Sequence, residues 1–231
     1  MTAPRAGLPT GEAKAASVRS MFDAIAPRYD LVNRVMTLRM DVGWRRRAAA
    51  ALGLPPGSVV VDVACGTGDL CRALQDAGHR PIGLDFSPGM LAAAHTSAPL
   101  VLADALQMPL RDGSVDGATC GFALRNVVDL RALLGELARV VRAGGSISVL
   151  EVARPERSLL RWGHRIYFDR LVPVIGGLLS DRHAYGYLPA SAAYLPERPA
   201  LVALFEEAGF AGARSQLLAL GAAQLVTGTR A

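Results

Sequence analysis

VVVDVACGTGDL, residues Val59 to Leu70, is the stretch that decides the fold expected for this chain. The β-branched run around Asp62 is typical of a buried parallel strand, and Gly66 and Gly68 are typical of a tight loop. The residues that follow have the spacing of a helix. The stretch therefore predicts a strand, a glycine loop and a helix N-terminus in succession.

A second apolar stretch, residues 81–84, ends in Asp85, seventeen residues after Gly68. An acid at the tip of the neighbouring strand suits the binding of a ribose diol. The loop has only Gly66 and Gly68 and lacks the third glycine of the dinucleotide fingerprint, so no pyrophosphate is expected on the helix N-terminus. The pattern indicates a nucleoside without phosphates, and S-adenosylmethionine is the commonest ligand of that kind.

Apolar strands and helices alternate after residue 58, which predicts an α/β fold. We expect a Rossmann-like open mixed sheet of seven strands, the last one antiparallel, with helices on both faces. Ligands of such sheets bind beyond the carboxyl ends of the strands, and the first strand is expected at the switch point. The expected strands are 59–64, 80–85, 100–103, 115–121, 146–152, 213–220 and 222–229, and the expected helices between them are 69–77, 88–95, 130–141 and 199–208.

The chain is expected to form a single domain over residues 12–231, after a disordered tail of residues 1–11. An aromatic and apolar segment after the fifth strand is expected to be an inserted helical cap that supplies an apolar substrate pocket. The expected parts are N-terminal helices over 12–52, a cofactor-binding core over 58–152, the substrate cap over 153–198, and a closing helix and strands over 199–231.

The composition limits the partners of the chain. With 231 residues, 51% of them hydrophobic, it can build one substantial core. Its 25 basic residues against 20 acids give a net charge of +5, and because they are scattered, no nucleic-acid partner is expected. The three cysteines lack metal-ligand spacing, which predicts no metal, no disulfide and a reducing cytoplasm.

One basic cluster, Trp44-Arg45-Arg46-Arg47, has two interpretations. It is either a solvated helix face, the commoner case, or a contact with anionic lipid headgroups. No apolar run is long enough to span a bilayer, so we expect a cytoplasmic protein with peripheral contact at the inner face of an anionic membrane as an option. A homodimer is left open.

Two further acids follow strand-like segments. The Asp62 carboxylate is expected to accept hydrogen bonds from the loop backbone or to hold the amino group of the methionine part of the cofactor. Asp104 is expected to accept from the adenine amine. Each acid has an alternative interpretation as a helix cap or turn residue, and for Asp104 the two are equally favoured.

Three motifs narrow the family. FDAIAPRYD at 22–30 with Asn33, CGTGDL at 65–70 and GFALRNV at 121–127 resemble the ubiquinone and menaquinone biosynthesis C-methyltransferases, a family that includes demethylmenaquinone methyltransferases. The resemblance runs from residue 18 to residue 210. It implies a class I fold that uses S-adenosylmethionine, and transfer of a methyl group to a ring carbon of a polyprenylated quinol. The cofactor contacts that it implies are Thr67, Asp85, Asp104 and Ala105.

The acceptor side can be reasoned from its chemistry. A ring carbon becomes nucleophilic when the neighbouring phenol loses its proton, and a phenol with a pKa of about 10 needs a cationic neighbour for this at neutral pH. We expect Arg125 to stabilise the phenolate and Asn126 to orient the quinol oxygen, with Glu151 as the first candidate for proton acceptor and Tyr29 closing over the site. Alternatively, Arg125 caps a strand end, Asn126 makes a turn bond and Tyr29 packs in the core.

These sequence features are compatible with three functions. The favoured one is C-methylation of a polyprenyl quinol, with demethylmenaquinol as the first choice of substrate. The second is methylation of another small aromatic acceptor in specialised metabolism by the same fold. The third is a nucleoside-binding module without catalysis, which would need neither the cap nor the pair Arg125 and Asn126.

Overall fold

The computed structural model describes residues 10–153 and 191–231. Most of the expected cap, including all of its aromatic residues except Tyr194, lies outside the described residues. The chain begins with α1 (Gly11–Ile25), the short 3-10 helix η1 (Ala26–Arg28), α2 (Tyr29–Met36) and α3 (Met40–Ala50). Pro27 falls in η1, where its missing N–H separates α1 from α2.

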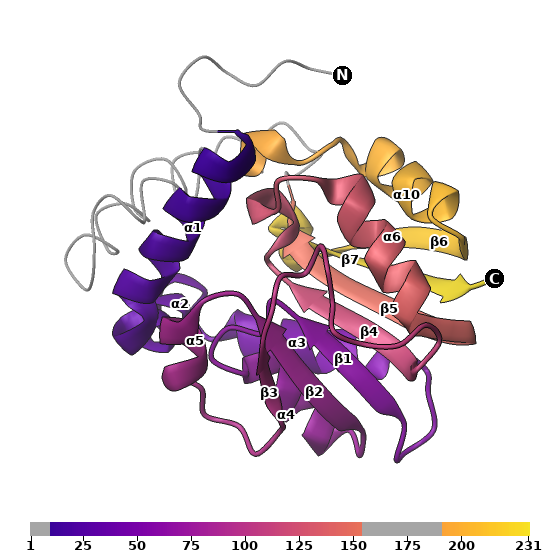
Figure 1. The fold of residues 1–231 in the computed structure, drawn as a ribbon, viewed down its shortest axis with the longest axis horizontal. Helices are drawn as coiled ribbons and strands as arrows, with labels where there is room; N and C mark the ends of the chain where they lie inside the picture. Colours follow the sequence, from indigo (N-terminus) through magenta and orange to yellow (C-terminus); the bar gives the residue numbers. More distant parts are fainter. Residues whose placement is uncertain (1–9, 154–190) are drawn as a thin grey trace.

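One seven-stranded sheet forms the centre of the protein (Figure 1), in the order β3-β2-β1-β4-β5-β7-β6. β7 is antiparallel to both β5 and β6, and the other pairs are parallel, so the predicted mixed sheet is confirmed. The order reverses between β1 and β4, which places the switch point beside the first strand. The strands are β1 (Val59–Val63), β2 (Arg80–Asp85), β3 (Leu100–Leu102), β4 (Val115–Gly121), β5 (Val141–Val152), β6 (Phe210–Leu218) and β7 (Ala223–Arg230).

The remaining described helices lie between the strands, as predicted. Three boundaries differ from the expectation by three residues or more, one of them the start of β6 at Phe210, where residue 213 was expected. The helix expected over 88–95 ends at Ala92, because the amide of His95 donates to the carbonyl of Thr67 instead of continuing the helix. The fifth strand begins at Val141, which pairs with Val115 before an irregularity in the register. The helices are α4 (Asp69–Asp76), α5 (Pro88–Ala92), η2 (Leu124–Asn126), α6 (Leu130–Val140), η4 (Ala192–Tyr194), α10 (Arg198–Glu207) and η5 (Ala219–Gly221).

Helices cover both faces of the sheet, which explains the nearly continuous apolar runs of its central strands. On one face, Leu137 of α6 and Phe205 of α10 pack in the largest core cluster. On the other face, Ala48 of α3 and Leu74 of α4 pack in a second cluster. Figure 1 shows α1, α2 and α5 grouped at one end of the molecule, where Met90 of α5 belongs to a third cluster shared with the N-terminal helices.

Candidate cofactor and acceptor site

The glycine loop after β1 is built from left-handed backbone. Gly66 and Gly68 have φ angles of 55° and 83°, which residues with a side chain rarely adopt. The amide of Gly68 donates to the carbonyl of Cys65 at 2.9 Å and closes a tight turn before α4. A Cβ atom built on Gly66 would meet nothing within 4 Å, so there is open space beside the loop at this position.

Asp85, at the end of β2, holds this loop from the neighbouring strand. Its carboxylate accepts from the amide of Gly66 at 2.8 Å and from the amide of Ser87 at 2.9 Å. Burial raises the pKa of the Asp85 carboxyl, and these backbone hydrogen bonds partly offset the rise. Each carboxylate oxygen can accept a second hydrogen bond, so the predicted ribose contact remains chemically open.

The contacts of Asp62 differ from those expected. Its carboxylate is fully buried and accepts from the Thr119 hydroxyl at 2.8 Å and from the Cys71 thiol at 3.4 Å. Burial raises the pKa of Asp62 to about 7, and these two hydrogen bonds only partly offset the effect. Because Asp62 lies inside β1 and not beyond its end, its side chain braces β1 against β4 and α4 and does not accept from the loop backbone.

A hollow of about 620 Å³ lies between α1 and the ends of β2 and β3, where the adenine contacts are expected. Asp23 of α1 and Phe86 and Asp104 at the strand ends are among its lining residues. Asp104 is exposed, and its carboxylate accepts from the Leu106 amide at 2.9 Å. Ala105 is half-buried against the main core. Asp104 therefore makes a turn bond and also borders a cavity, as each of its two interpretations requires.

The segment after β4 presents Arg125 and Asn126 on η2. Phe122, just before it, has a left-handed φ of 60°, a strained conformation for a residue with a side chain. The Phe122 carbonyl accepts from Arg125 Nη1 at 2.8 Å and from Asn126 Nδ2 at 3.5 Å. The strained turn therefore fixes both candidate acceptor residues relative to the end of β4.

Glu151, near the end of β5, forms a buried ion pair with Arg125. Its Oε1 accepts from Arg125 Nη1 at 2.5 Å and from the Val152 amide at 2.8 Å. The Glu151 side chain is 0% exposed. These contacts suit a residue that orients the Arg125 guanidinium. Proton acceptance by Glu151 stays a prediction.

Two buried polar atoms on η2 have no hydrogen-bond partner among the described residues, Arg125 Nε and Asn126 Oδ1. The first is a donor and the second an acceptor. Because an unpaired buried polar group costs stability, such atoms in a folded protein call for an explanation, and a bound ligand is one.

Tyr29, at the start of α2, is half-buried and lies edge-on to Phe22, with 6.0 Å between the ring centroids. Burial raises the pKa of the Tyr29 hydroxyl. The charge of Arg45, a hydrogen bond with Asn33 and the charge of Arg125 partly offset that rise. Tyr29 thus packs in the N-terminal cluster and lies within electrostatic reach of Arg125, so its predicted role at the site remains a prediction.

Helix α2 is fastened to the glycine loop by contacts that were not predicted. The Thr67 hydroxyl donates to Asp30 at 2.6 Å, and Arg34 Nη2 lies 2.8 Å from Asp69 at the start of α4. Thr67, an expected cofactor contact, is therefore held in place by the N-terminal region. The partners are 37 and 35 residues apart, so no local pattern identifies them.

Arg45 fits neither interpretation of the basic cluster, which leaves both interpretations to Arg46 and Arg47. It is 8% exposed, pairs with Asp41 and lies 3.5 Å from Asp69. Packing of α3 against α4 turns this face of the helix inward, while Arg46 and Arg47 remain exposed. The spacing of Asp41 and Arg45, four residues apart, favours helical ion pairs and was the available signal.

Lys14 fastens α1 across the acceptor side. Its Nζ donates to the Val127 carbonyl at 2.7 Å and lies 3.7 Å from the ring centroid of Tyr194. Burial lowers the pKa of Lys14 to about 8. Farther along α1, Asp23 accepts from the Ser87 hydroxyl at 2.6 Å. One helix therefore connects the segment after β2 with η2 and η4.

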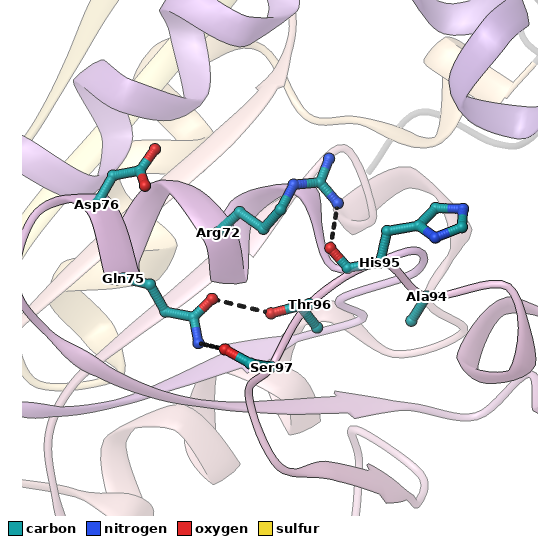
Figure 2. Close-up of a pocket in the computed structure, with 7 residues that line it drawn as sticks. All are labelled: Arg72, Gln75, Asp76, Ala94, His95, Thr96 and Ser97. Carbon is teal, nitrogen blue, oxygen red and sulfur yellow. Dashed lines mark hydrogen bonds between the residues drawn. The ribbon is translucent and has the colours of Figure 1, made fainter.

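A second hollow, of about 560 Å³, lies between α4 and the segment after α5 (Figure 2). Arg72 donates to the His95 carbonyl at 2.6 Å, and Gln75 bonds with Thr96 at 3.1 Å and with Ser97 at 2.9 Å. None of the predicted site residues lines it. We therefore assign the candidate site to the strand ends and not to this hollow.

Within residues 10–153 and 191–231, no cluster of three or more His, Cys, Asp or Glu side chains is arranged to hold a metal ion. No helix in the described part of the chain has the length and apolar character needed to cross a membrane.

The strand order, the glycine loop and the acid at the tip of β2 define a class I methyltransferase. The open space at Gly66, the Asp85 carboxylate and the hollow beside Asp104 fit the nucleoside and sulfonium parts of S-adenosylmethionine. The fold is shared with a SAM-dependent methyltransferase from Thermotoga maritima, with a TM-score of 0.66 at 19% identity over 93% of this chain and all of the other. It is also shared with magnesium protoporphyrin IX methyltransferase from Synechocystis PCC 6803 with bound SAM, with a TM-score of 0.61 at 16% identity over 98% of this chain and 100% of the other.

Residues 10–230 match the ubiE/COQ5 methyltransferase family, and the chain belongs to that family. A demethylmenaquinone methyltransferase from Roseiflexus castenholzii is 42% identical over 96% of this chain and 97% of its own. A second demethylmenaquinone methyltransferase, from Thermus thermophilus, is 42% identical over 91% of this chain and 100% of its own. The ubiquinone/menaquinone biosynthesis C-methyltransferase UbiE of Geobacter sp. strain M21 is 37% identical over 94% of this chain and 97% of its own. The predicted family, enzyme class and cofactor, an S-adenosylmethionine-dependent C-methyltransferase of quinone biosynthesis, are thereby confirmed.

Proposed function

We propose that this enzyme methylates a ring carbon of demethylmenaquinol to form menaquinol, at residues carried by the ends of β1, β2, β4 and β5. The names of the relatives from Roseiflexus and Thermus support the substrate. The observation that carries the acceptor site is a pair of buried atoms, Arg125 Nε and Asn126 Oδ1, that have no hydrogen-bond partner within residues 10–153 and 191–231. A quinol oxygen can accept from the first and, while protonated, donate to the second.

The cofactor side consists of the glycine loop and the strand tips. S-adenosylmethionine supplies a methyl group on a positively charged sulfur. Gly66 and Gly68 give close backbone approach, and Thr67 is held in position by Asp30. Asp85 binds the ribose, and Asp104 with Ala105 borders the adenine. The role of Asp62 is to hold β1 in place beneath the loop, since its side chain is fully buried.

On the acceptor side, Arg125 stabilises the negative charge that develops on the quinol oxygen when its proton leaves. An arginine remains protonated, so it acts as a preorganised donor and not as the base. Glu151 keeps the guanidinium in one orientation through the buried ion pair. Asn126 orients the quinol oxygen, and Tyr29 on α2 closes the site next to both substrates. The proton leaves to water or to a carboxylate, with Glu151 as the first candidate among the carboxylates.

The Arg125 assignment is tested by measuring two quantities on one variant, the rate of quinol methylation and the affinity for S-adenosylmethionine. Arg125→Ala should lower the rate by a factor of about 10² to 10³, the range for loss of one preorganised donor. Its S-adenosylmethionine affinity should stay near that of the wild type. Arg125→Lys should restore only part of the rate, because a point charge does not reproduce the planar fork.

Removing Arg125 alone leaves Glu151 as a buried unpaired charge, which destabilises proteins by about 3 to 5 kcal/mol. Arg125→Met combined with Glu151→Met removes both charges and should fold, bind the cofactor and remain inactive. If rate and cofactor affinity fall together in this double variant as well, the pair supports the cofactor site and its proposed role with the quinol is wrong.

The polyprenyl chain of the acceptor makes the lipid bilayer the proposed source of substrate, with the enzyme bound peripherally at the cytoplasmic face. Turnover should then be faster with long-chain quinol in vesicles that contain anionic lipid than in neutral vesicles, and the difference should shrink as salt is added. Equal rates on both vesicles at every salt concentration would remove anionic lipid from the proposal.

A further inference from the structure

An apolar stripe lies on α2 and on the turn into α3. Leu31 and Val35 are one helical turn apart on α2 and are 57% and 40% exposed. Leu38 and Met40 follow in the turn and are 78% and 44% exposed. We call these four residues the α2–α3 corner. The other large exposed apolar side chains of the described residues are widely spaced in the sequence, namely Leu102, Val128 and Leu220.

The charges exposed around the corner are all positive. Residues 31–47 contain a single acid, Asp41. It is 1% exposed and is paired with arginines of α2 and α3. Arg39, Arg46 and Arg47 are exposed. The surface formed by this segment therefore combines apolar side chains with three arginines that form no ion pair with the described residues.

The backbone of the turn is strained. Leu38 and Arg39 have φ angles of 50° and 63°, a region that residues with a side chain avoid. The preceding Met36 is buried, whereas Leu38 projects into solvent. The turn therefore holds the Leu38 side chain outward, next to the exposed side chains of α2.

We infer that the α2–α3 corner docks on an anionic lipid membrane, with its four apolar side chains at the acyl boundary and Arg39, Arg46 and Arg47 at the headgroup phosphates. Apolar tips flanked by arginines and free of exposed acids match the layered chemistry of such a surface. The inference rests on the proposed function, because a polyprenyl quinol dissolves in lipid. It also moves the contact away from Arg45, which is buried.

The corner runs along α2, whose start contacts the glycine loop, and continues into the turn after it. α2 has eight residues, which span about 12 Å. At its start, Asp30 accepts from Thr67 of the loop at 2.6 Å. Docking at the corner therefore places the membrane surface about one short helix from the cofactor loop, within reach of a quinol whose prenyl chain stays in the lipid.

The apolar part is tested by vesicle sedimentation of the full chain, with phosphatidylcholine vesicles and with vesicles that also contain phosphatidylglycerol. Leu31→Ser combined with Leu38→Ser should weaken partitioning by about tenfold or more, from the loss of buried apolar area. The matched control is Leu220→Ser, because Leu220 is also 78% exposed and also has a left-handed φ, of 57°. The control should bind as the wild type does.

The cationic part is tested with Arg46→Glu combined with Arg47→Glu. Removal of two cations near an anionic surface should weaken binding by at least about 25-fold, and only on vesicles that contain phosphatidylglycerol. The control reverses two exposed arginines elsewhere, Arg80→Glu with Arg111→Glu. It matches the change in net charge and should retain more binding than the corner variant.

Two readouts separate failure of the docking surface from failure of the proposed function. Corner variants should keep wild-type turnover of a short-chain quinol in solution and lose turnover of long-chain quinol in vesicles. The inference is overturned if wild-type protein does not sediment with anionic vesicles, if the Leu220 control loses as much binding as the corner variant, or if corner variants only convert a dimer into a monomer. If the wild type does not methylate the short-chain quinol in solution, the proposed function is wrong instead.

Discussion

Replacing Asp62 with asparagine should remove a pH dependence of folding. Burial raises the pKa of Asp62 from 3.8 to about 7, against the lowering effect of hydrogen bonds from Thr119 and Cys71. A carboxyl whose pKa is higher in the folded protein than in the unfolded chain binds its proton more tightly when folded. Its stabilising contribution is therefore complete below a pH of about 4 and is lost as the pH rises through about 7.

The size of the effect follows from the shift. A difference of about 3 pKa units corresponds to roughly 4 kcal/mol of unfolding free energy lost between a pH of about 4 and a pH of about 8. Asparagine keeps an oxygen that can accept from the Thr119 hydroxyl, and it does not titrate. Across this range, the wild type should lose up to that amount of stability relative to Asp62→Asn.

The measurement is urea unfolding of both proteins at a series of pH values. Asp116→Asn is the control, since a hydrogen bond from Arg142 lowers the pKa of Asp116. The stabilisation from Asp116 is lost only as the pH falls below about 4, so the difference in stability between the wild type and Asp116→Asn should stay constant over the tested range. A constant difference between wild type and Asp62→Asn from a pH of about 4 to about 8 would refute the reasoning.

Two further substitutions probe the cofactor loop. Gly68→Ala should lower the free energy of unfolding in urea by about 1 to 3 kcal/mol more than Gly57→Ala does. The two glycines have nearly the same φ, 83° and 84°, so the backbone strain is matched. Only at Gly68 would the new Cβ meet a neighbour, Thr96 Cγ2 at 2.6 Å. Equal costs would show that the backbone angle alone matters. Asp30→Asn weakens a charge-assisted hydrogen bond from Thr67 and should lower S-adenosylmethionine affinity by roughly fivefold in isothermal titration. The exposed Asp112→Asn serves as its control, and an unchanged affinity in Asp30→Asn would show that this bond does not prepare the loop.

The sequence was sufficient to predict the sheet because most of its strands are short apolar runs, and two of them end in a residue that disfavours strands, Asp85 for β2 and Gly121 for β4. β2 and β4 have the predicted boundaries. β5 does not, because Ala143, Gly144 and Gly145 have the composition of a loop, and Gly144 has a left-handed φ of 73°. The strand extends across this irregularity only because Val141, on its far side, pairs with Val115 of β4. The start of β5 is thus determined by a tertiary contact, which no local sequence pattern predicts.

The candidate site was predicted residue by residue, but its pairings were not. Arg125 and Glu151 were each expected at a strand end with a separate role, and the structure joins them in one ion pair. Which acid binds which arginine depends on the side chains of adjacent strands and on how far each is buried. The same limit applies to Arg45, since a basic run indicates charge but not which face of its helix turns inward.

Lys14 is the only lysine in the chain, and it is 4% exposed beneath the Tyr194 ring. An amine-reactive acylating reagent therefore has one ε-amino target, and that target is covered while α1 lies in place. Burial lowers the pKa of this amine to about 8, and the pKa returns toward its usual value when the amine is uncovered, so labelling is best carried out above neutral pH. The rate of acylation at Lys14, followed by mass spectrometry, should therefore report the fraction of molecules in which α1 has separated from the acceptor side. No engineered probe is needed for this measurement.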